Sequence, residues 1–141
     1  MKNTANTKPA TADAATPPRV IEVLYDGECP MCRTYCESVQ LKNPGDKLVL
    51  VDARHSSLLL DEVTARGLDI DEGMVVKVNG VMHYGSDAMR ALVRFKKSPF
   101  YERCLYRSRR VAKVLYATLK FMRNIVLHVL RIEKIRNLGI G

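Results

Sequence analysis

Two cysteines separated by two residues are the part of this sequence best suited to chemistry. Cys29 and Cys32 enclose the dipeptide Pro-Met, and a strand-like segment with a turn precedes them. A helix that starts here holds both thiols on one side, and its unpaired N–H groups and positive dipole end favour the thiolate of Cys29. Cys32, one turn further, is expected to be more buried and to attack the mixed disulfide that Cys29 forms. The spacing therefore predicts Cys29 as the nucleophile and Cys32 as the resolving thiol.

The residues around this pair influence its chemistry. Pro30 suits the first turn of a helix and can also hold the disulfide ring tight. Asp26 and Glu28 place negative charge near Cys29, which opposes the thiolate and predicts a less oxidising site than one flanked by cations. The Asp26-Gly27 step is either a plain turn or the source of a buried carboxylate that relays the proton of the resolving thiol.

A metal site is the main alternative for the same cysteines. Cys29, Cys32 and Cys36 are the candidate ligands for zinc or an iron–sulfur cluster. A structural zinc site normally adds a second Cys/His pair at matching spacing, and the remaining His residues and Cys104 are isolated in the sequence. Cys36 itself is a core residue, a third redox partner or a cluster ligand. The redox interpretation is preferred, with no cofactor beyond a redox-active Cys29–Cys32 disulfide.

Strand and helix patterns alternate along the chain and indicate an α/β domain. The expected strands are residues 20–25, 47–51, 74–78 and 81–84, and the expected helices are residues 30–42, 56–66 and 86–95. Asn79-Gly80 supplies the positive φ angles of a type I′ hairpin turn, and Ser86 can cap the last of these helices. The order β-α-β-α-β-β-α predicts a mixed sheet with flanking helices, as in thioredoxin-like proteins.

Positive charge is concentrated at the C-terminal end of the chain. The 141 residues hold 23 Lys and Arg against 15 Asp and Glu, a formal net charge of +8. Residues 101–141 account for the whole excess, with ten basic and two acidic residues. Apolar residues at spacings of three and four predict one amphipathic helix over about residues 101–137, and they are Val111, Leu115, Leu119, Met122, Val126 and Val129.

These patterns divide the chain into three parts. Residues 1–18 are expected to form a disordered leader, residues 19–98 the thioredoxin-like domain, and residues 99–141 a basic amphipathic helical extension. The extension either packs on its own domain, binds a protein partner or lies on an anionic membrane surface through residues 100–137. Nucleic acid is an unlikely partner, because the extension lacks a motif for base readout. Without a secretory signal or an uncharged spanning segment, we expect a cytoplasmic location, with peripheral attachment to the inner membrane surface as an option.

The sequence Y-D-G-E-C-P-M-C at residues 25–32 resembles the DCC family of predicted thiol-disulfide oxidoreductases, whose signature is D-G-x-C-P-x-C. A weaker likeness continues to Y-G-S-D-A at residues 84–88 and covers about residues 20–95 in all. The resemblance implies a thioredoxin-like fold and disulfide reduction or exchange, with Cys29 and Cys32 as the redox pair and Asp26 as the third signature residue.

Such a dithiol would act on a disulfide-containing protein or a small-molecule disulfide, and an external thiol or reductase would regenerate it. One departure concerns the third strand. Typical thioredoxins carry a cis-proline just before it, and Gly73-Met74 stands at that place here. The difference affects the backbone on which substrates usually dock, and it keeps the zinc or iron–sulfur alternative open.

Overall fold

A four-stranded mixed sheet forms the centre of the domain in a computed structural model that describes residues 17–138. Strand β1 (Val20–Tyr25) lies between β2 (Lys47–Asp52) and β3 (Val75–Val78), and β4 (Val81–Tyr84) forms the far edge. β1 pairs parallel with β2 and antiparallel with β3, which pairs antiparallel with β4. The parallel pairing places Tyr25 beside Asp52, so the segments after both strands emerge at one edge of the sheet.

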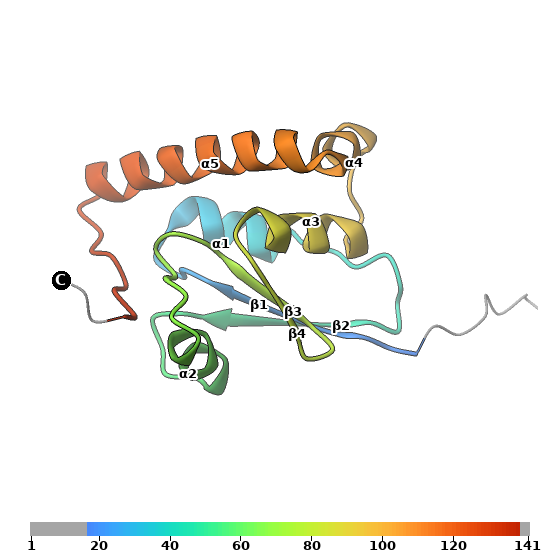
Figure 1. The fold of residues 1–141 in the computed structure, drawn as a ribbon, viewed down its shortest axis with the longest axis horizontal. Helices are drawn as coiled ribbons and strands as arrows, with labels where there is room; N and C mark the ends of the chain where they lie inside the picture. The colour runs from blue at the N-terminus through green and yellow to red at the C-terminus, as the bar shows by residue number, and fades with distance from the viewer. Residues whose placement is uncertain (1–16, 139–141) are drawn as a thin grey trace, which may run out of the picture.

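Both faces of the sheet are covered by helices. Alternate residues of β1 point to opposite faces, so that Ile21 and Val23 join one buried cluster and Leu24 joins another. The first cluster packs under α1 (Pro30–Glu37) and α3 (Ser86–Phe95), and the second packs over α2 (Leu58–Ala65) on the opposite side (Figure 1). The mixed α/β architecture is consistent with a thioredoxin-like fold, as the sequence predicted.

The C-terminal extension adds a further layer outside α1 and α3. It contains α4 (Phe100–Arg107) and α5 (Arg109–Val129), which run above that face of the domain (Figure 1). Met89 and Val93 of α3 pack with Tyr106 of α4 and Ala112 of α5 in a third buried cluster. The extension therefore shares a core with the domain.

Several expected element boundaries were wrong. The first helix ends at Glu37 instead of Lys42, because Ser38 caps it and Leu41 then pairs with Lys96 as an isolated bridge. Gly85, with a φ of 64°, is the N-cap of α3, so Ser86 is the first helical residue and makes no cap. Ser57 does cap α2, and Asn79 and Gly80 have the positive φ angles expected of the hairpin.

The expected single helix over residues 101–137 is two helices followed by an irregular segment. Ser108 separates α4 from α5 with an extended backbone, and α5 ends at Val129. The face of α5 that packs on the domain includes Ala112, Leu115 and Leu127, whereas Val111, Met122 and Val129 of the expected stripe are exposed. Most of the expected leader, and residues 139–141, lie outside the described residues.

Candidate active site

Cys29 is the N-cap residue of α1, and Pro30 is its first helical residue. The Cys29 Sγ accepts a hydrogen bond from the backbone N–H of Cys32 at 3.5 Å. The positive end of the helix therefore points at Cys29, as the spacing and Pro30 predicted. The N–H of Cys29 also donates to the carbonyl of Asp26 at 3.3 Å, which closes the turn between strand and helix.

The two thiols differ strongly in acidity. A hydrogen bond from the Cys32 side chain, the Cys32 N–H and the positive charge of Arg123 together lower the pKa of Cys29 from 9.0 to about 6, against the opposing effect of burial. The pKa of Cys32 is raised, because its proton is held by Cys29 and because the side chain is buried. The pair therefore favours a thiolate on Cys29 and a protonated thiol on Cys32.

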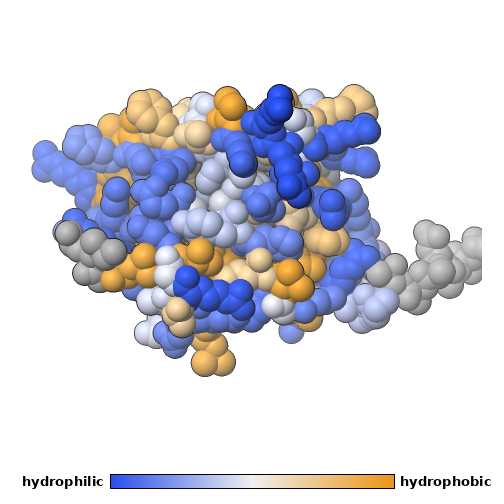
Figure 2. Space-filling model, viewed as in Figure 1, coloured by the Kyte–Doolittle hydropathy of each residue, from blue (hydrophilic) through white to orange (hydrophobic). Residues whose placement is uncertain are grey.

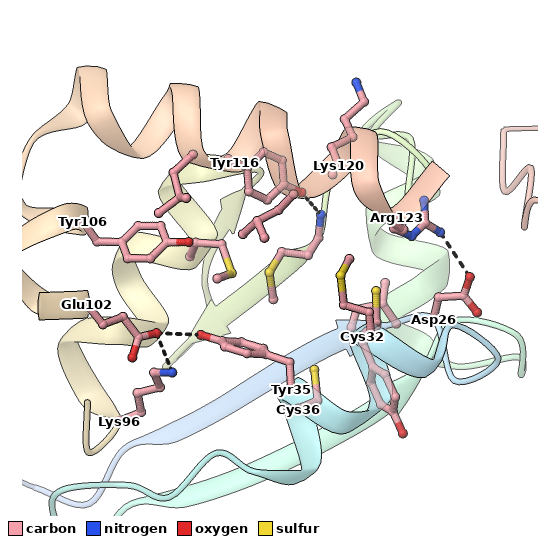
Figure 3. A pocket seen from close by; sticks show the side chains of 18 of the residues that line it. Asp26, Cys32, Tyr35, Cys36, Lys96, Glu102, Tyr106, Tyr116, Lys120 and Arg123 are labelled. Carbon is pink, nitrogen blue, oxygen red and sulfur yellow. Dashed lines mark hydrogen bonds and ion pairs between the residues drawn. The ribbon is translucent and has the colours of Figure 1, made fainter. Parts of the chain in front are cut away.

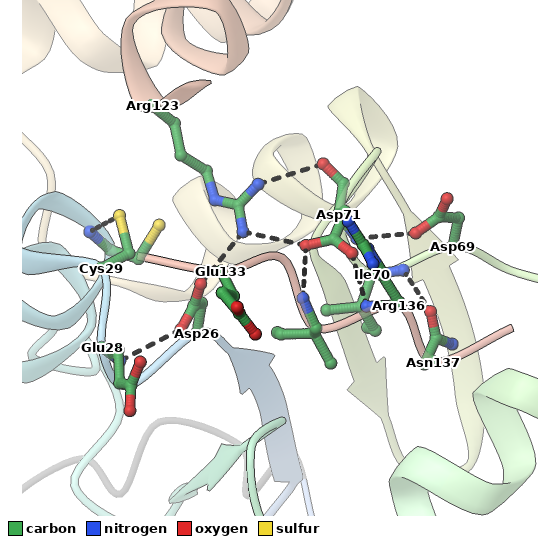
Figure 4. A network of polar contacts seen from close by, with 12 residues as sticks. Asp26, Glu28, Cys29, Asp69, Ile70, Asp71, Arg123, Glu133, Arg136 and Asn137 are labelled. Carbon is green, nitrogen blue, oxygen red and sulfur yellow. Dashed lines mark hydrogen bonds and ion pairs between the residues drawn. The ribbon is translucent and has the colours of Figure 1, made fainter. Parts of the chain in front are cut away.

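Solvent exposure of the two cysteines is the reverse of what the sequence suggested. Cys29 is fully buried, whereas Cys32 is half-buried and lines a cavity. We had expected Cys32 to be the less accessible thiol because it lies further along the helix. Arg123 of α5 reaches Asp26 close to Cys29 (Figure 4), so the C-terminal layer contributes a charged side chain to the site.

Asp26 connects the dithiol to two arginines that the sequence analysis did not identify. Arg54 donates to both carboxylate oxygens of Asp26, at 2.8 and 3.1 Å, and Arg123 donates to Oδ2 at 3.1 Å. The backbone N–H of Glu28 adds a further hydrogen bond to Oδ1 at 3.0 Å. The Asp26 side chain is almost completely buried, so this carboxylate is more than part of a turn.

These contacts determine the charge state of Asp26. Burial raises its pKa, but the hydrogen bonds and charges of Arg54 and Arg123 outweigh that effect, and the pKa lies below its ordinary value of 3.8. A carboxylate held ionised in this way is a weak base, which favours a positioning role over a proton relay. Positive charge also lies near the dithiol, because Arg123 lowers the pKa of Cys29 and Arg54 lies beside the exposed Glu28. The less oxidising site expected from Asp26 and Glu28 stays a prediction.

Gly27 lies against the side chain of Asp52. Its N–H donates to Oδ1 of Asp52 at 3.1 Å, and a Cβ on residue 27 would collide with the other carboxylate oxygen. Since Asp52 ends the parallel neighbour of β1, this contact joins the two strand ends. A larger residue at position 27 would therefore have to displace Asp52 from this contact.

A second acidic residue, Asp71, binds the segment that follows α5 and holds it beside the site (Figure 4). Its carboxylate accepts hydrogen bonds from the N–H groups of Ile135 and Arg136, at 3.0 and 2.7 Å, and its carbonyl accepts one from Arg123 at 3.0 Å. Asn137 donates to the carbonyl of Leu68 at 2.8 Å. Residues 133–137 thus return to the edge of the sheet where the cysteines lie.

A cavity of about 470 Å³ lies between the domain and the C-terminal layer (Figure 3). Cys32 and Cys36 of α1 lie in its wall, together with apolar and tyrosine side chains of α4 and α5. Met74, just before β3, donates its backbone N–H to the hydroxyl of Tyr116 at 2.8 Å. A side chain of α5 therefore already accepts the backbone hydrogen bond that the Gly73-Met74 step can donate.

Cys36 belongs to the core. It is buried in the cluster beneath α1, and burial raises the pKa of its thiol to about 12. Within residues 17–138 no three Cys, His, Asp or Glu side chains are grouped so as to hold a metal ion. The arrangement thus gives no support to a ligand set of Cys29, Cys32 and Cys36, and Cys104 lies exposed on α4.

Comparison with known proteins identifies the family. The family model described as DCC1-like thiol-disulfide oxidoreductase matches residues 23–126, which include the dithiol, Asp26, Arg54 and Arg123. Searches of curated proteins and of solved structures each returned no match. The match extends well beyond the CxxC motif into the C-terminal helices. On this basis, the chain belongs to the DCC1-like thiol-disulfide oxidoreductase family.

Proposed function

We propose that this protein reduces or exchanges disulfides through Cys29 and Cys32. The Cys29 thiolate attacks one sulfur of a substrate disulfide, whose S–S bond breaks as the other sulfur leaves and takes a proton. Cys32 then loses its proton and attacks Cys29 Sγ, which releases the second substrate thiol and forms the Cys29–Cys32 disulfide. One substrate disulfide is reduced while two protein thiols are oxidised, and an external thiol or reductase restores the dithiol.

The opposed acidities of the two neighbouring thiols carry this proposal. The helix N-terminus and the Cys32 hydrogen bond stabilise a thiolate on Cys29, and Cys32 keeps its proton until it is needed. Because Cys29 is buried, its reaction requires a shift of the side chains that cover it. Asp26 and Arg54 hold the end of β1 in place, and Arg123 supplies positive charge near the reacting sulfur.

Thiol titration before and after mild oxidation tests the proposal in a Cys104→Ser background. We expect oxidation to remove two titratable thiols from this protein and from a Cys36→Ser variant, which serves as the control because Cys36 is also a buried cysteine of α1. The added Cys32→Ser substitution should abolish this paired loss. Persistence of all thiols after oxidation would refute the proposal, as would stoichiometric zinc or iron bound by the purified protein.

We also propose that α5 associates with anionic lipid through its outer face. Val114, Phe121, Ile125 and Val129 lie on the side of the helix that faces away from the domain, and all are exposed. Hydrophobic and strongly hydrophilic residues alternate along the upper edge in Figure 2, where α5 runs in Figure 1. A helix that is apolar on both sides needs a second apolar partner.

The charge of the extension favours lipid as that partner. Exposed Arg109, Arg110 and Lys113 begin α5, and this basic segment would repel a second copy of itself while it attracts anionic headgroups. Within residues 17–138 no helix has the length and hydropathy required to cross a bilayer. The proposed association is therefore peripheral.

Vesicle co-sedimentation tests this association with the full chain. We expect binding to vesicles that contain phosphatidylserine, weak binding to neutral vesicles, and at least a severalfold loss of binding in Phe121→Ser. Leu58→Ser is the matched control, because Leu58 is an exposed leucine on α2 at the opposite side of the sheet. Equal binding by both variants, or no binding at all, would contradict the proposal.

A further inference from the structure

We propose that the substrate is a small, uncharged and largely apolar disulfide that enters the cavity beneath α4 and α5 and lies there against Cys32, the neighbour of the nucleophile Cys29. This inference rests on the proposed function, including the shift of side chains that exposes Cys29, and it specifies the substrate class. It also accounts for a pair in which one thiol is buried and the other lines a cavity.

The size and lining of the cavity fit a small molecule. Its volume of about 470 Å³ lies within the range of roughly 300–1,000 Å³ that small-molecule sites occupy. Apolar side chains from three different elements make up much of the wall, among them Met31 of α1, Met89 of α3 and Leu119 of α5. Methionine side chains are flexible and adapt to ligands of irregular shape, so the wall suits an apolar guest.

The charged groups in the wall are already paired with one another. Lys96 contacts Glu102 at 2.6 Å, and both side chains are largely buried. Arg123 contacts Asp26 and Asp71, and Lys120 contacts Glu72. A substrate with its own charge would lose water without gaining a free counter-charge here, and this loss is far more costly for an ion than for a neutral molecule.

The same layer of helices disfavours a polypeptide substrate. An extended peptide would need free backbone donors at a strand end, but the Met74 N–H is already bonded to Tyr116 of α5. The thiol with lowered pKa, Cys29, is fully buried, so a disulfide on the surface of a folded protein cannot contact it in this arrangement. A small disulfide in the cavity lies against the half-buried Cys32, directly beside Cys29, and the shift of side chains that exposes Cys29 then needs to be only local.

Two aromatic disulfide reagents of similar size test the inference in the Cys104→Ser protein. Dithiodipyridine is uncharged, and dithiobis(nitrobenzoate) carries two carboxylates. Each rate constant is divided by that for a free thiol such as N-acetylcysteine. We expect the reduced protein to prefer the uncharged reagent by about tenfold or more, because the dianion must be desolvated. The positive charge of the chain and of Arg123 would produce the opposite preference if the thiols reacted from open solvent.

Variants that fill the cavity provide a second test, and an exposed position on the same helix provides its control. Leu119→Trp should slow the uncharged reagent severalfold, while Ala117→Trp, at an exposed position on the same helix outside the cavity wall, should leave its rate unchanged. Leu115→Trp, also in the wall, serves as a second filling variant, and thermal unfolding shows which variants fold. Equal normalised rates for the two reagents, or a preference for the dianion, would overturn the inference.

The outcomes separate this inference from the function on which it rests. If oxidation still couples Cys29 to Cys32 but the uncharged reagent has no advantage, the dithiol is active and the substrate class is wrong. If the uncharged reagent is preferred but no internal disulfide forms, the cavity delivers ligands and the exchange proposal fails.

Discussion

Replacing Cys32 with alanine is expected to raise the pKa of Cys29 well above its value of about 6, whereas replacement with serine should hold it lower. The hydrogen bond from the Cys32 side chain is the largest influence on that pKa. A serine hydroxyl can still donate to the Cys29 sulfur, and an alanine methyl group cannot. Because each pKa unit is a tenfold change in the ratio of thiolate to thiol, the alanine variant should hold about tenfold less thiolate near neutral pH.

The pH dependence of thiolate absorbance in the ultraviolet measures this difference without requiring access to the buried sulfur. The Cys104→Ser background removes the exposed thiol, and Cys36 stays protonated because burial raises its pKa to about 12. In this background we expect a midpoint near 6 with Cys32 present, a similar or slightly higher midpoint with serine, and a midpoint closer to 9.0 with alanine. If both variants titrate together near 9.0, a serine hydroxyl does not replace the Cys32 thiol as the donor to Cys29; if both stay near 6, the side-chain hydrogen bond is irrelevant.

Local sequence patterns sufficed for the parts of the site that neighbouring residues build. Cys29, Pro30 and Cys32 lie within one helical turn, and the turn at Asp26-Gly27 follows directly from β1. The hairpin at Asn79-Gly80 likewise depends on two adjacent residues. These features are fixed by short-range geometry, so composition and spacing predict them well.

Arg54 could have been anticipated from topology. A β-α-β unit places the ends of two parallel strands side by side, and Arg54 follows the second of them as Asp26 follows the first. Both strands are predictable from their apolar runs, so the side chains that follow them can be expected to meet at one edge of the sheet. A buried carboxylate needs a counter-charge, and the basic residue after the neighbouring strand was the available candidate.

Arg123 and Asp71 could not be found in this way. Arg123 lies 97 residues after Asp26, on a helix whose packing face the expected apolar stripe identified only in part, through residues such as Leu115. The packing face of α5 carries Arg123 among apolar residues. Charged residues are mostly solvent-exposed, so a sequence alone predicts exposure for an arginine whose buried partner is not known. The burial of Cys29 was also missed, since the exposure of a side chain depends on its tertiary neighbours and not on its place in the helix.

The Asp26→Asn substitution is expected to destabilise the protein by about 3–5 kcal/mol, because it leaves Arg54 and Arg123 close together and without their shared carboxylate. Glu28→Gln is the matched control. It also removes a carboxylate beside Arg54, but the Glu28 side chain is 61% exposed, so we expect a loss of no more than about 1 kcal/mol. Urea unfolding of the reduced proteins measures both free energies.

The pH dependence of the same free energies tests the cause. The folded-state pKa of Asp26 lies below 3.8, so its contribution to stability is fully present above that pH and is lost as the pH falls through the folded-state pKa. The difference in stability between the wild type and Asp26→Asn should therefore shrink in acid. A difference that stays constant across this range would mean that the aspartate acts through packing or hydrogen-bond geometry and not through its charge.

The same variant distinguishes an electrostatic role for Asp26 from a proton relay. The negative charge of Asp26 opposes the thiolate, so its removal should lower the pKa of Cys29 even though it weakens the fold. A relay predicts something different, namely an unchanged midpoint for Cys29 and a slower attack by Cys32 on the mixed disulfide. Rapid mixing with excess dithiodipyridine separates the first and second thiol releases. Because Asp26 is held ionised by two guanidinium groups, we expect the midpoint to move and the ratio of the two release rates to stay near that of the wild type.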